Sequence, residues 1–333
     1  MNLLTVNSLT VHTEHQSGPI NILDNLNFKI ESGKSLGVVG ESGCGKSMMA
    51  FAIMGLLPEN MTASGEVLFG SNLLRLPEKE LCQIRGNRMG MVFQEPMTAL
   101  NPVLPIGFQV AESLRLHKSL SLHEAQNQAS KVLDRVGLPA KNFSRSLYPH
   151  QLSGGQRQRV VIAIALVCEP ELIIADEPTT ALDVTIQEQI LALISELVLE
   201  RNMALILITH DLGVVAENTD QMLVMYAGRI VERGPTQKVF RHLAHPYTRG
   251  LFACIPDSEK SLNEPSQQLE YSRKKRLSTI PGRVPEFWER SKGCSFADRC
   301  SRTQVKCSSL VPDEIQFDTG HYTNCFFPYE QNE

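Results

Sequence analysis

Residues 40–47 read Gly40-Glu41-Ser42-Gly43-Cys44-Gly45-Lys46-Ser47. The stretch fits the phosphate-loop pattern G-x-x-x-x-G-K-[ST] at every fixed position. The mostly apolar residues 35–39 precede it as an expected buried strand, and residues 47–57 follow it as an expected helix. In such a strand–loop–helix unit, backbone N–H groups of the loop surround the β-phosphate of a nucleotide. We expect Lys46 to reach the β- and γ-phosphates and the Ser47 hydroxyl to bind Mg²⁺.

A second motif, Leu152-Ser153-Gly154-Gly155-Gln156, separates this loop from an acidic strand. Residues 171–175 form a mostly apolar run that ends in two adjacent carboxylates, Asp176 and Glu177. A parallel sheet binds ligands at the carboxyl ends of its strands, so Asp176 is expected in the Mg²⁺ shell. Because side chains alternate along a strand, Glu177 points elsewhere, toward the attacking water, and is the candidate general base.

The order of these motifs, with LSGGQ between the phosphate loop and the acidic strand, resembles that of ATP-binding-cassette (ABC) ATPases. The resemblance implies that Gln94 contacts Mg²⁺ and water and links the site to transport subunits. It implies that His210 contacts the γ-phosphate and that Asp183 crosses a dimer interface. The segment that would close over ATP held by a second ATPase subunit is Ser153, Gly154, Gly155 and Gln156.

The chain departs from this family near its N-terminus. ABC ATPases usually have an aromatic residue there that stacks on adenine, and alignment by eye places Thr13 at that position. His12 and His15 lie nearby and could supply an imidazole. We therefore leave the contact to the base unassigned.

Strands and helices alternate along the chain, which predicts an α/β fold with a mostly parallel, helix-covered sheet. Further strands are expected at residues 89–93 and 204–208, and helices at 121–136, from the LSGGQ motif to about 168, and around 186–198. Ser121 and Glu124 have the spacing of a capping box. We expect an ABC-type P-loop ATPase domain over residues 1–256 with a helical lobe at about 95–158, a linker over 257–279, and a small C-terminal Cys-rich extension over 280–333.

The C-terminal part of the chain points to a narrower family. Three stretches carry this signal: His245-Pro246-Tyr247-Thr248, Ile280-Pro281-Gly282-Arg283-Val284-Pro285 and Gly293-Cys294-Ser295-Phe296-Ala297-Asp298-Arg299-Cys300. Together with residues 92–102, they resemble the oligopeptide/dipeptide importer ATPases of the peptide/nickel group. In that family the segment after Gln94 lies near the groove that receives a membrane subunit, which makes Met97 and Leu100 candidates for an apolar docking surface.

This resemblance implies a subunit that powers import of di- and oligopeptides by binding and hydrolysing ATP. Its partners would be a second ABC ATPase subunit, two membrane permease subunits and, indirectly, an extracytoplasmic peptide-binding protein. The chain would act at the cytoplasmic face of the inner membrane. Import of nickel, a metallophore or another small solute is an alternative, and so is a non-transport regulatory ATPase with a redox-sensing tail.

Four of the eight cysteines, Cys294, Cys300, Cys307 and Cys325, lie in the last 40 residues of the chain. They are separated by five, six and seventeen residues, unlike the C-x₂-C pairs of many zinc sites. Four thiolates can hold either Zn²⁺ or an iron–sulfur cluster, and ligand softness does not separate the two. The family resemblance favours a [4Fe–4S] cluster, with zinc or merely structural thiols as alternatives.

Composition sets outer limits on the function. A net charge of −4 argues against a nucleic-acid partner, which usually selects a strongly basic surface. The longest apolar runs are far shorter than the roughly 18 residues that a membrane-spanning helix needs. The N-terminus lacks the features of a signal peptide. We therefore expect a cytosolic chain whose partner subunits supply any membrane spans.

Overall fold

The computed structural model describes residues 2–15, 18–180, 182–254 and 279–330. Its main sheet comprises β3 (Ser35–Val39), β6 (Met89–Val92), β7 (Leu172–Asp176), β8 (Ala204–Ile208), β9 (Gln221–Tyr226), β10 (Arg229–Pro235), β11 (Ile315–Asp318) and β12 (His321–Thr323). The eight strands have the order β11-β12-β10-β9-β3-β8-β7-β6. From β9 to β6 neighbouring strands are parallel, and β10, β12 and β11 extend the sheet in antiparallel fashion. The expected parallel core is confirmed.

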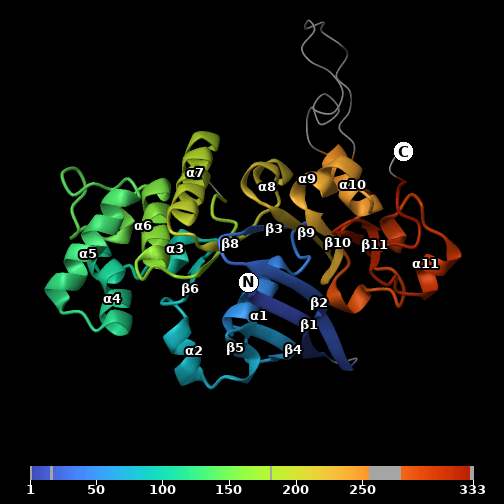
Figure 1. The fold of residues 1–333 in the computed structure, drawn as a ribbon, viewed down its shortest axis with the longest axis horizontal. Helices are drawn as coiled ribbons and strands as arrows, with labels where there is room; N and C mark the ends of the chain where they lie inside the picture. Colours follow the sequence, from blue (N-terminus) through green and yellow to red (C-terminus); the bar gives the residue numbers. More distant parts are fainter. Residues whose placement is uncertain (1, 16–17, 181, 255–278, 331–333) are drawn as a thin grey trace, which may run out of the picture.

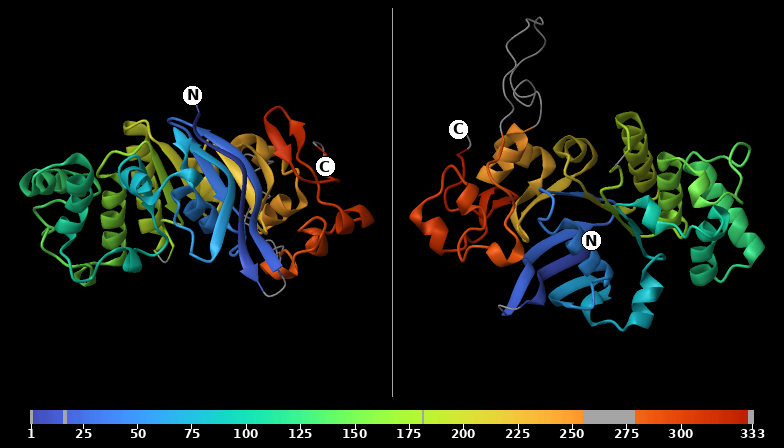
Figure 2. Two further views of the ribbon diagram at one scale, coloured as in Figure 1. Left: turned by 90° about the horizontal axis from the view of Figure 1, so that it is seen from below. Right: turned by 180° about the vertical axis from the view of Figure 1, so that it is seen from behind.

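A second sheet at the N-terminus is antiparallel and was not expected from the sequence. It contains β1 (Asn2–His15), β2 (Gly18–Glu31), β4 (Met61–Phe69) and β5 (Ser71–Asn72), in the order β2-β1-β4-β5. It crosses one face of the main sheet (Figure 2), and its apolar side shares a core with α1 (Lys46–Met54) and the main-sheet strands. Next to it lie η1 (Leu73–Arg75) and α2 (Glu78–Ile84). This packing fixes the helix that follows the phosphate loop.

Helices gather at one end of the molecule (Figure 1). They are α3 (Pro96–Ala99), α4 (Ile106–Lys118), α5 (Leu122–Arg135), η2 (Pro149–Gln151), α6 (Gly154–Leu166) and α7 (Val184–Glu200). No residue from 95 to 158, all of them described, lies in a strand, as expected. The predicted capping box also forms, because Ser121 Oγ accepts from the Glu124 N–H and the Glu124 carboxylate accepts from the Ser121 N–H. A buried core that includes Leu133 and Val160 joins this lobe to the main sheet.

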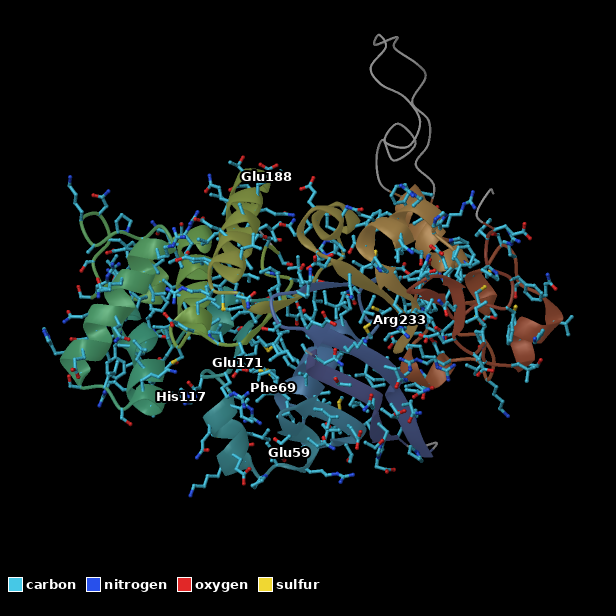
Figure 3. The ribbon with its side chains drawn as sticks, in the orientation of Figure 1. Glu59, Phe69, His117, Glu171, Glu188 and Arg233 are labelled. Atoms are coloured by element: carbon cyan, nitrogen blue, oxygen red, sulfur yellow. The ribbon has the colours of Figure 1, made fainter. Side chains whose placement is uncertain are left out.

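The C-terminal extension lies at the opposite end (Figure 1). Besides β11 and β12, it contains η3 (Phe287–Glu289), η4 (Ala297–Arg299) and α11 (Val305–Ser309). The helices that precede it in sequence are α8 (Leu212–Asn218), α9 (Thr236–His242) and α10 (Pro246–Ala253). Through β12, which pairs with β10, the extension continues the main sheet. Arg233 on β10, labelled in Figure 3, pairs with Glu314 of the extension at 2.6 Å. Of the predicted linker over 257–279, all but residue 279 lies outside the described residues.

A buried polar pair reinforces this junction. His321 Nε2 on β12 lies 2.7 Å from Glu232 Oε1 on β10, and both side chains are fully buried. The same carboxylate accepts hydrogen bonds from the backbone N–H groups of Ala244 and His245, at 2.8 and 2.9 Å. Charged groups are buried at low cost only when they are paired and hydrogen-bonded in this way. The extension is therefore attached through the interior of the protein.

Candidate functional site: a phosphate loop facing three strand ends

The phosphate loop connects β3 to α1. Two of its glycines are required by their surroundings: a Cβ at Gly40 would approach the Met225 carbonyl oxygen to 2.3 Å, and Gly45 has a φ of 105°. Lys46 Nζ donates to the carbonyl oxygens of Gly40 and Glu41, at 2.7 and 3.1 Å. Its ammonium group therefore lies inside the curve of the loop, where the phosphates of a nucleotide would be bound.

Ser47 and Asp176 meet beside this loop. Asp176 ends β7 and is 2% exposed, and its carboxylate lies beside the Ser47 side chain. Burial raises the pKa of the Asp176 carboxyl, and the nearby Ser47 hydroxyl opposes that shift. One carboxylate oxygen, Oδ1, is buried without a hydrogen-bond partner. A hydroxyl and an unsatisfied carboxylate are the oxygen ligands that Mg²⁺ prefers, so these two residues fit the ion that the sequence predicts.

Glu177 is the meeting point of the other candidate residues. It has a left-handed φ of 44°, which turns its carboxylate out of the direction of β7. Glu177 Oε2 accepts a hydrogen bond from Gln94 Nε2 at 3.4 Å and lies 3.3 Å from His210 Nδ1. It also accepts from the Thr180 hydroxyl at 2.9 Å, and its other oxygen is 3.9 Å from Lys46 Nζ. The structure thus brings Gln94, Lys46, Glu177 and His210 together.

The LSGGQ residues form the N-terminus of α6. Ser153 Oγ accepts from the Gln156 N–H at 3.3 Å, and Gln156 Oε1 accepts from the Ser153 N–H at 2.9 Å. This capping box leaves Ser153 and Gly154 exposed. Asp183 caps α7 in a similar way by accepting from the Ile186 N–H at 3.0 Å, and it too is exposed. Both helix N-termini therefore present polar groups and backbone N–H groups at the surface.

At position 13, where ABC ATPases usually have an aromatic residue, β1 carries a threonine. The Thr13 hydroxyl donates to the Asn60 carbonyl at 3.0 Å, within the β1–β4 sheet. His15 instead stacks on Trp288 of the extension, with ring centroids 5.7 Å apart and an angle of 6° between the rings.

The two residues expected to dock a membrane subunit differ in exposure. Met97, on α3, is 59% exposed, as a docking residue must be. Leu100 is 2% exposed and packs in the core of the helical lobe. Its placement on the docking surface was wrong, because the chain after α3 turns Leu100 inward. Sequence alone could not separate the two apolar side chains.

The four C-terminal cysteines converge, although they come from separate turns. Cys294, Cys300, Cys307 and Cys325 all line one small cavity with Phe296, Phe326 and Phe327. Burial raises the pKa of Cys325 to about 12, and it also raises the pKa values of Cys294 and Cys300. Among the described residues, no group of three or more His, Cys, Asp or Glu side chains is arranged as a metal site. The chemistry of this donor set suits a soft metal centre, but its thiols are not arranged as a ligand shell.

Two contacts to the phosphate loop were missed. The Glu41 carboxylate is paired with Arg299, and the Glu41 N–H donates to the Tyr247 hydroxyl at 2.9 Å. Both partners lie within stretches that carried the narrower family resemblance, yet nothing in those stretches indicated contact with residue 41.

Comparison with known proteins agrees with this site. Residues 23–180 match the family model for ABC transporters, and residues 231–307 match that for the C-terminal region of oligopeptide/dipeptide transporters. The oligopeptide transport ATP-binding protein OppD of Haemophilus influenzae is 44% identical over 330 residues, covering 99% of this chain and 98% of its own. OppD of Salmonella typhimurium is 46% identical over 332 residues, covering 99% and 95%.

A solved structure extends the comparison to the fold. The dimeric ATP-binding cassette MJ0796, in a post-hydrolysis state with ADP and Pi, is similar with a TM-score of 0.63 and 30% identity. The match covers 70% of this chain and 98% of that one. In the part of the chain that the structure describes, no helix is both long enough and apolar enough to cross a membrane.

The phosphate loop, the LSGGQ start of α6 and the acidic end of β7 all lie within residues 23–180, which match the ABC-transporter model, and together they define an ABC-type ATPase. With near full-length identity of 44–46% to the OppD proteins and a matching C-terminal region, the chain belongs to the family of ATP-binding proteins of oligopeptide ABC transporters.

Proposed function

We propose that this chain binds and hydrolyses MgATP to power import of di- or oligopeptides. The single observation that carries the proposal is the convergence of Lys46, Glu177, Gln94 and His210 beside the Ser47–Asp176 pair. The peptide substrate is supported by the relatives, which are named as oligopeptide transport proteins, and by the matching C-terminal region.

The geometry supports a division of roles within the site. Ser47 and Asp176, with Gln94, would hold Mg²⁺, which neutralises phosphate charge when bound. Gly40, Glu41, Ser42, Gly43, Cys44, Gly45 and Lys46 would bind the phosphates. Glu177 accepts a proton from the attacking water, Gln94 orients that water, and His210 contacts the γ-phosphate. Gln94 and His210 already meet the Glu177 carboxylate, so the three are placed for one shared task.

Hydrolysis requires a second ATPase subunit in this proposal. Ser153, Gly154, Gly155 and Gln156 are at the exposed start of α6, and Asp183 is at the exposed start of α7. Backbone N–H groups at a helix N-terminus bind anions, so this surface suits the phosphates of ATP bound by the partner. The similar ABC cassette was solved as a dimer with ADP and Pi.

Two permease subunits would complete the assembly at the cytoplasmic face of the membrane, with a peptide-binding protein outside. Exposed Met97, on α3 directly after the Gln94 region, would contact a permease. A strain lacking this chain tests the proposal, since the wild type should restore uptake of a labelled oligopeptide and Lys46→Ala should not. Restored uptake of nickel alone would favour the metal-importer alternative. Restoration of neither would favour a regulatory ATPase.

A second proposal concerns Cys294, Cys300, Cys307 and Cys325: we propose that they hold a [4Fe–4S] cluster. It is supported by their convergence on one cavity with a mostly apolar lining; because the thiols are not arranged as a ligand shell, the cluster would have to draw them together. The full chain, purified without oxygen, should be brown, absorb broadly near ~400 nm and contain about four irons. Cys307→Ser should lose the colour, whereas Cys82→Ser, at an exposed thiol of α2, should keep it. Colourless protein with one tightly bound zinc would replace the cluster by the zinc alternative.

A further inference from the structure

The phosphate loop is tied to the C-terminal extension by an ion pair that spans 258 residues of sequence. Arg299 Nη1 donates to Glu41 Oε2 at 2.7 Å, and Arg299 Nη2 donates to Glu41 Oε1 at 3.0 Å. The Arg299 side chain is 6% exposed and that of Glu41 is 31% exposed. Two parallel bonds between guanidinium and carboxylate fix distance and orientation together, and partial burial protects them from screening.

An aromatic cluster holds the backbone of the same loop residue. The Tyr247 hydroxyl accepts the Glu41 N–H at 2.9 Å, and burial raises the pKa of Tyr247, so the hydroxyl stays neutral. Tyr247 packs edge-on against Tyr226, and Phe296 of the extension packs against both rings, with centroids 4.7–5.3 Å apart. Glu41 is therefore held by its carboxylate and by its N–H, from two sides.

Arg299 lies between Cys294 and Cys300 in the sequence, within a turn that backbone hydrogen bonds hold together. It ends η4, where the Arg299 N–H donates to the Phe296 carbonyl and the Cys300 N–H donates to the Ala297 carbonyl. The Cys294 carbonyl accepts from the Ala297 N–H, and the Cys294 N–H donates to the Cys307 carbonyl at 2.8 Å. Arg299 Nε also donates to the Pro281 carbonyl at 2.7 Å. The turn that carries the cysteines thus fixes the backbone of Arg299, and the Pro281 carbonyl holds its side chain.

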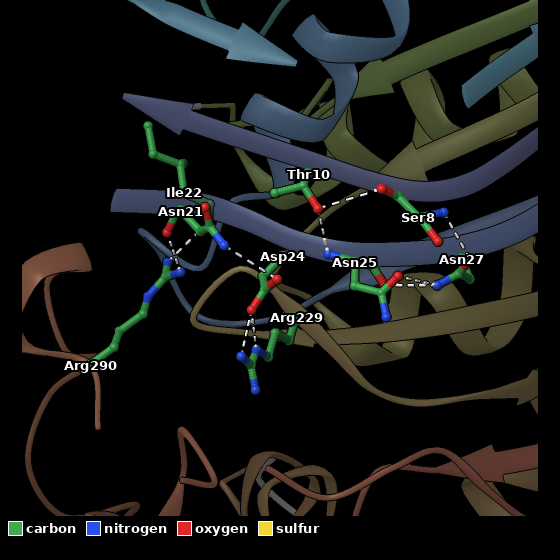
Figure 4. A network of polar contacts seen from close by, with 9 residues as sticks. All are labelled: Ser8, Thr10, Asn21, Ile22, Asp24, Asn25, Asn27, Arg229 and Arg290. Atoms are coloured by element: carbon green, nitrogen blue, oxygen red, sulfur yellow. Dashed lines mark hydrogen bonds and ion pairs between the residues drawn. The ribbon is translucent and has the colours of Figure 1, made fainter. Parts of the chain in front are cut away.

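A second arginine of the extension reaches the strand beside the loop (Figure 4). Arg290 donates to the carbonyl oxygens of Asn21 and Ile22 on β2, at 2.7 and 3.1 Å. The neighbouring Gly228 N–H donates to the Cys44 carbonyl at 2.8 Å, and Arg229 pairs with Asp24. The extension thus contacts the start of the phosphate loop directly, through Arg299 and Glu41. Through Arg290 it also contacts the part of β2 that lies near Gly228, the residue bonded to Cys44.

We propose that Arg299 is a positioning residue that couples the four-cysteine segment to the phosphate loop and so sets the affinity for ATP. The reason lies in Lys46, whose ammonium group donates to the carbonyl oxygens of Gly40 and Glu41. A shift of residue 41 moves one of these acceptors and the loop N–H groups around it. The inference rests on the nucleotide site proposed above, but it does not depend on the transported substrate.

The test measures MgATP dissociation constants by calorimetry on the full chain. Arg299→Met should raise the Kd about tenfold, within the range for coupled contacting residues. Glu41→Gln should raise it similarly, and the double variant should add little to either. Arg299→Lys keeps the charge without the two-bond geometry and should give an intermediate Kd. The matched control is Arg283→Met, because Arg283 lies in the same extension but pairs with Glu286 and Glu289.

Two readouts separate positioning from general destabilisation. In the assembled transporter, Arg299→Met should raise KM for ATP about tenfold and leave kcat within about twofold, since the pair acts on binding. Cys300→Ser should raise the Kd as well, while Cys82→Ser should not.

A wild-type Kd in Arg299→Met and Arg299→Lys, or additive effects of Arg299→Met and Glu41→Gln, would overturn the coupling. Wild-type affinity in Cys300→Ser would remove the cysteines from it. Failure of the wild-type chain to bind MgATP would overturn the nucleotide site itself.

Discussion

His210 Nδ1 lies 3.3 Å from the Oε2 atom of Glu177. The two residues follow neighbouring parallel strands, β8 and β7, and Gln94, which also contacts Glu177, follows β6. Three consecutive strand ends therefore deliver three side chains to one point opposite Lys46. This arrangement is the basis of the role that we propose for Glu177.

Glu177→Gln should keep MgATP binding and lose most turnover. The amide has nearly the shape of the carboxylate but cannot take a proton from water, so the rate should fall by ~10²–10⁴. Steady-state phosphate release by the assembled complex, with ATP affinity measured alongside, checks this result. Glu188→Gln, at an exposed position of α7 on the upper edge of the view in Figure 3, is the matched control. Turnover close to that of the wild type in Glu177→Gln would remove Glu177 from the role of base.

Gly154→Asp should abolish ATP hydrolysis while leaving ATP binding to the same chain largely intact. The new carboxylate would lie at the exposed start of α6, where it would repel the phosphates held by a partner subunit. Sedimentation with MgATP should show the wild type forming dimers and Gly154→Asp remaining monomeric. Undiminished hydrolysis by this variant would contradict the requirement for pairing.

Met97→Glu and Leu100→Glu should impair the protein in different ways, the first by blocking peptide uptake and the second by destabilising the fold. Exposed Met97 can be replaced without loss of folding, since Arg157 lies beside it and can meet the new carboxylate. This variant should hydrolyse ATP but lose peptide uptake. Leu100→Glu places a charge in the core and should lower the free energy of unfolding by about 3 kcal/mol or more. Denaturant unfolding and uptake assays separate the two, and normal uptake by Met97→Glu would exclude the docking role.

Stability should fall in mild acid through His245. Burial lowers the pKa of this histidine from 6.5 to about 4, so between these values the unfolded chain takes up a proton that the folded chain does not. The stabilising contribution of neutral His245 to the free energy of unfolding is present above pH 6.5. It is lost as the pH falls toward 4, at up to about 1.4 kcal/mol per pH unit.

His245→Asn tests this sign. Asparagine can still accept the Tyr247 N–H at the start of α10, a bond that His245 Nδ1 makes at 3.0 Å. The variant's free energy of unfolding should therefore change less between pH 6.5 and 4 than that of the wild type, as measured by urea unfolding. His123→Asn, on the exposed face of α5, should follow the wild-type curve. Equal slopes for wild type and His245→Asn would contradict the buried neutral imidazole.

Local patterns predicted the parts of the fold whose cause is local. The β3–loop–α1 unit, the acidic strand end and the Ser121–Glu124 cap all depend on residues close together in sequence. The N-terminal sheet was missed because pairs such as Thr13 with Met61 depend on contacts distant in sequence. The Arg299–Glu41 pair and the inward turn of Leu100 also arise from tertiary packing, which the spacing of residues along the sequence does not reveal.

Peptide uptake by a purified assembly is the decisive test of whether this chain powers peptide import. The measurement is ATP-dependent accumulation of a labelled oligopeptide in proteoliposomes that contain this chain, its partner ATPase, the permease subunits and the binding protein. We predict accumulation with MgATP that disappears in Lys46→Ala and Glu177→Gln, together with ATP hydrolysis stimulated by the loaded binding protein. Hydrolysis that proceeds without any peptide accumulation, at the same rate with and without the loaded binding protein, would contradict peptide import by this chain.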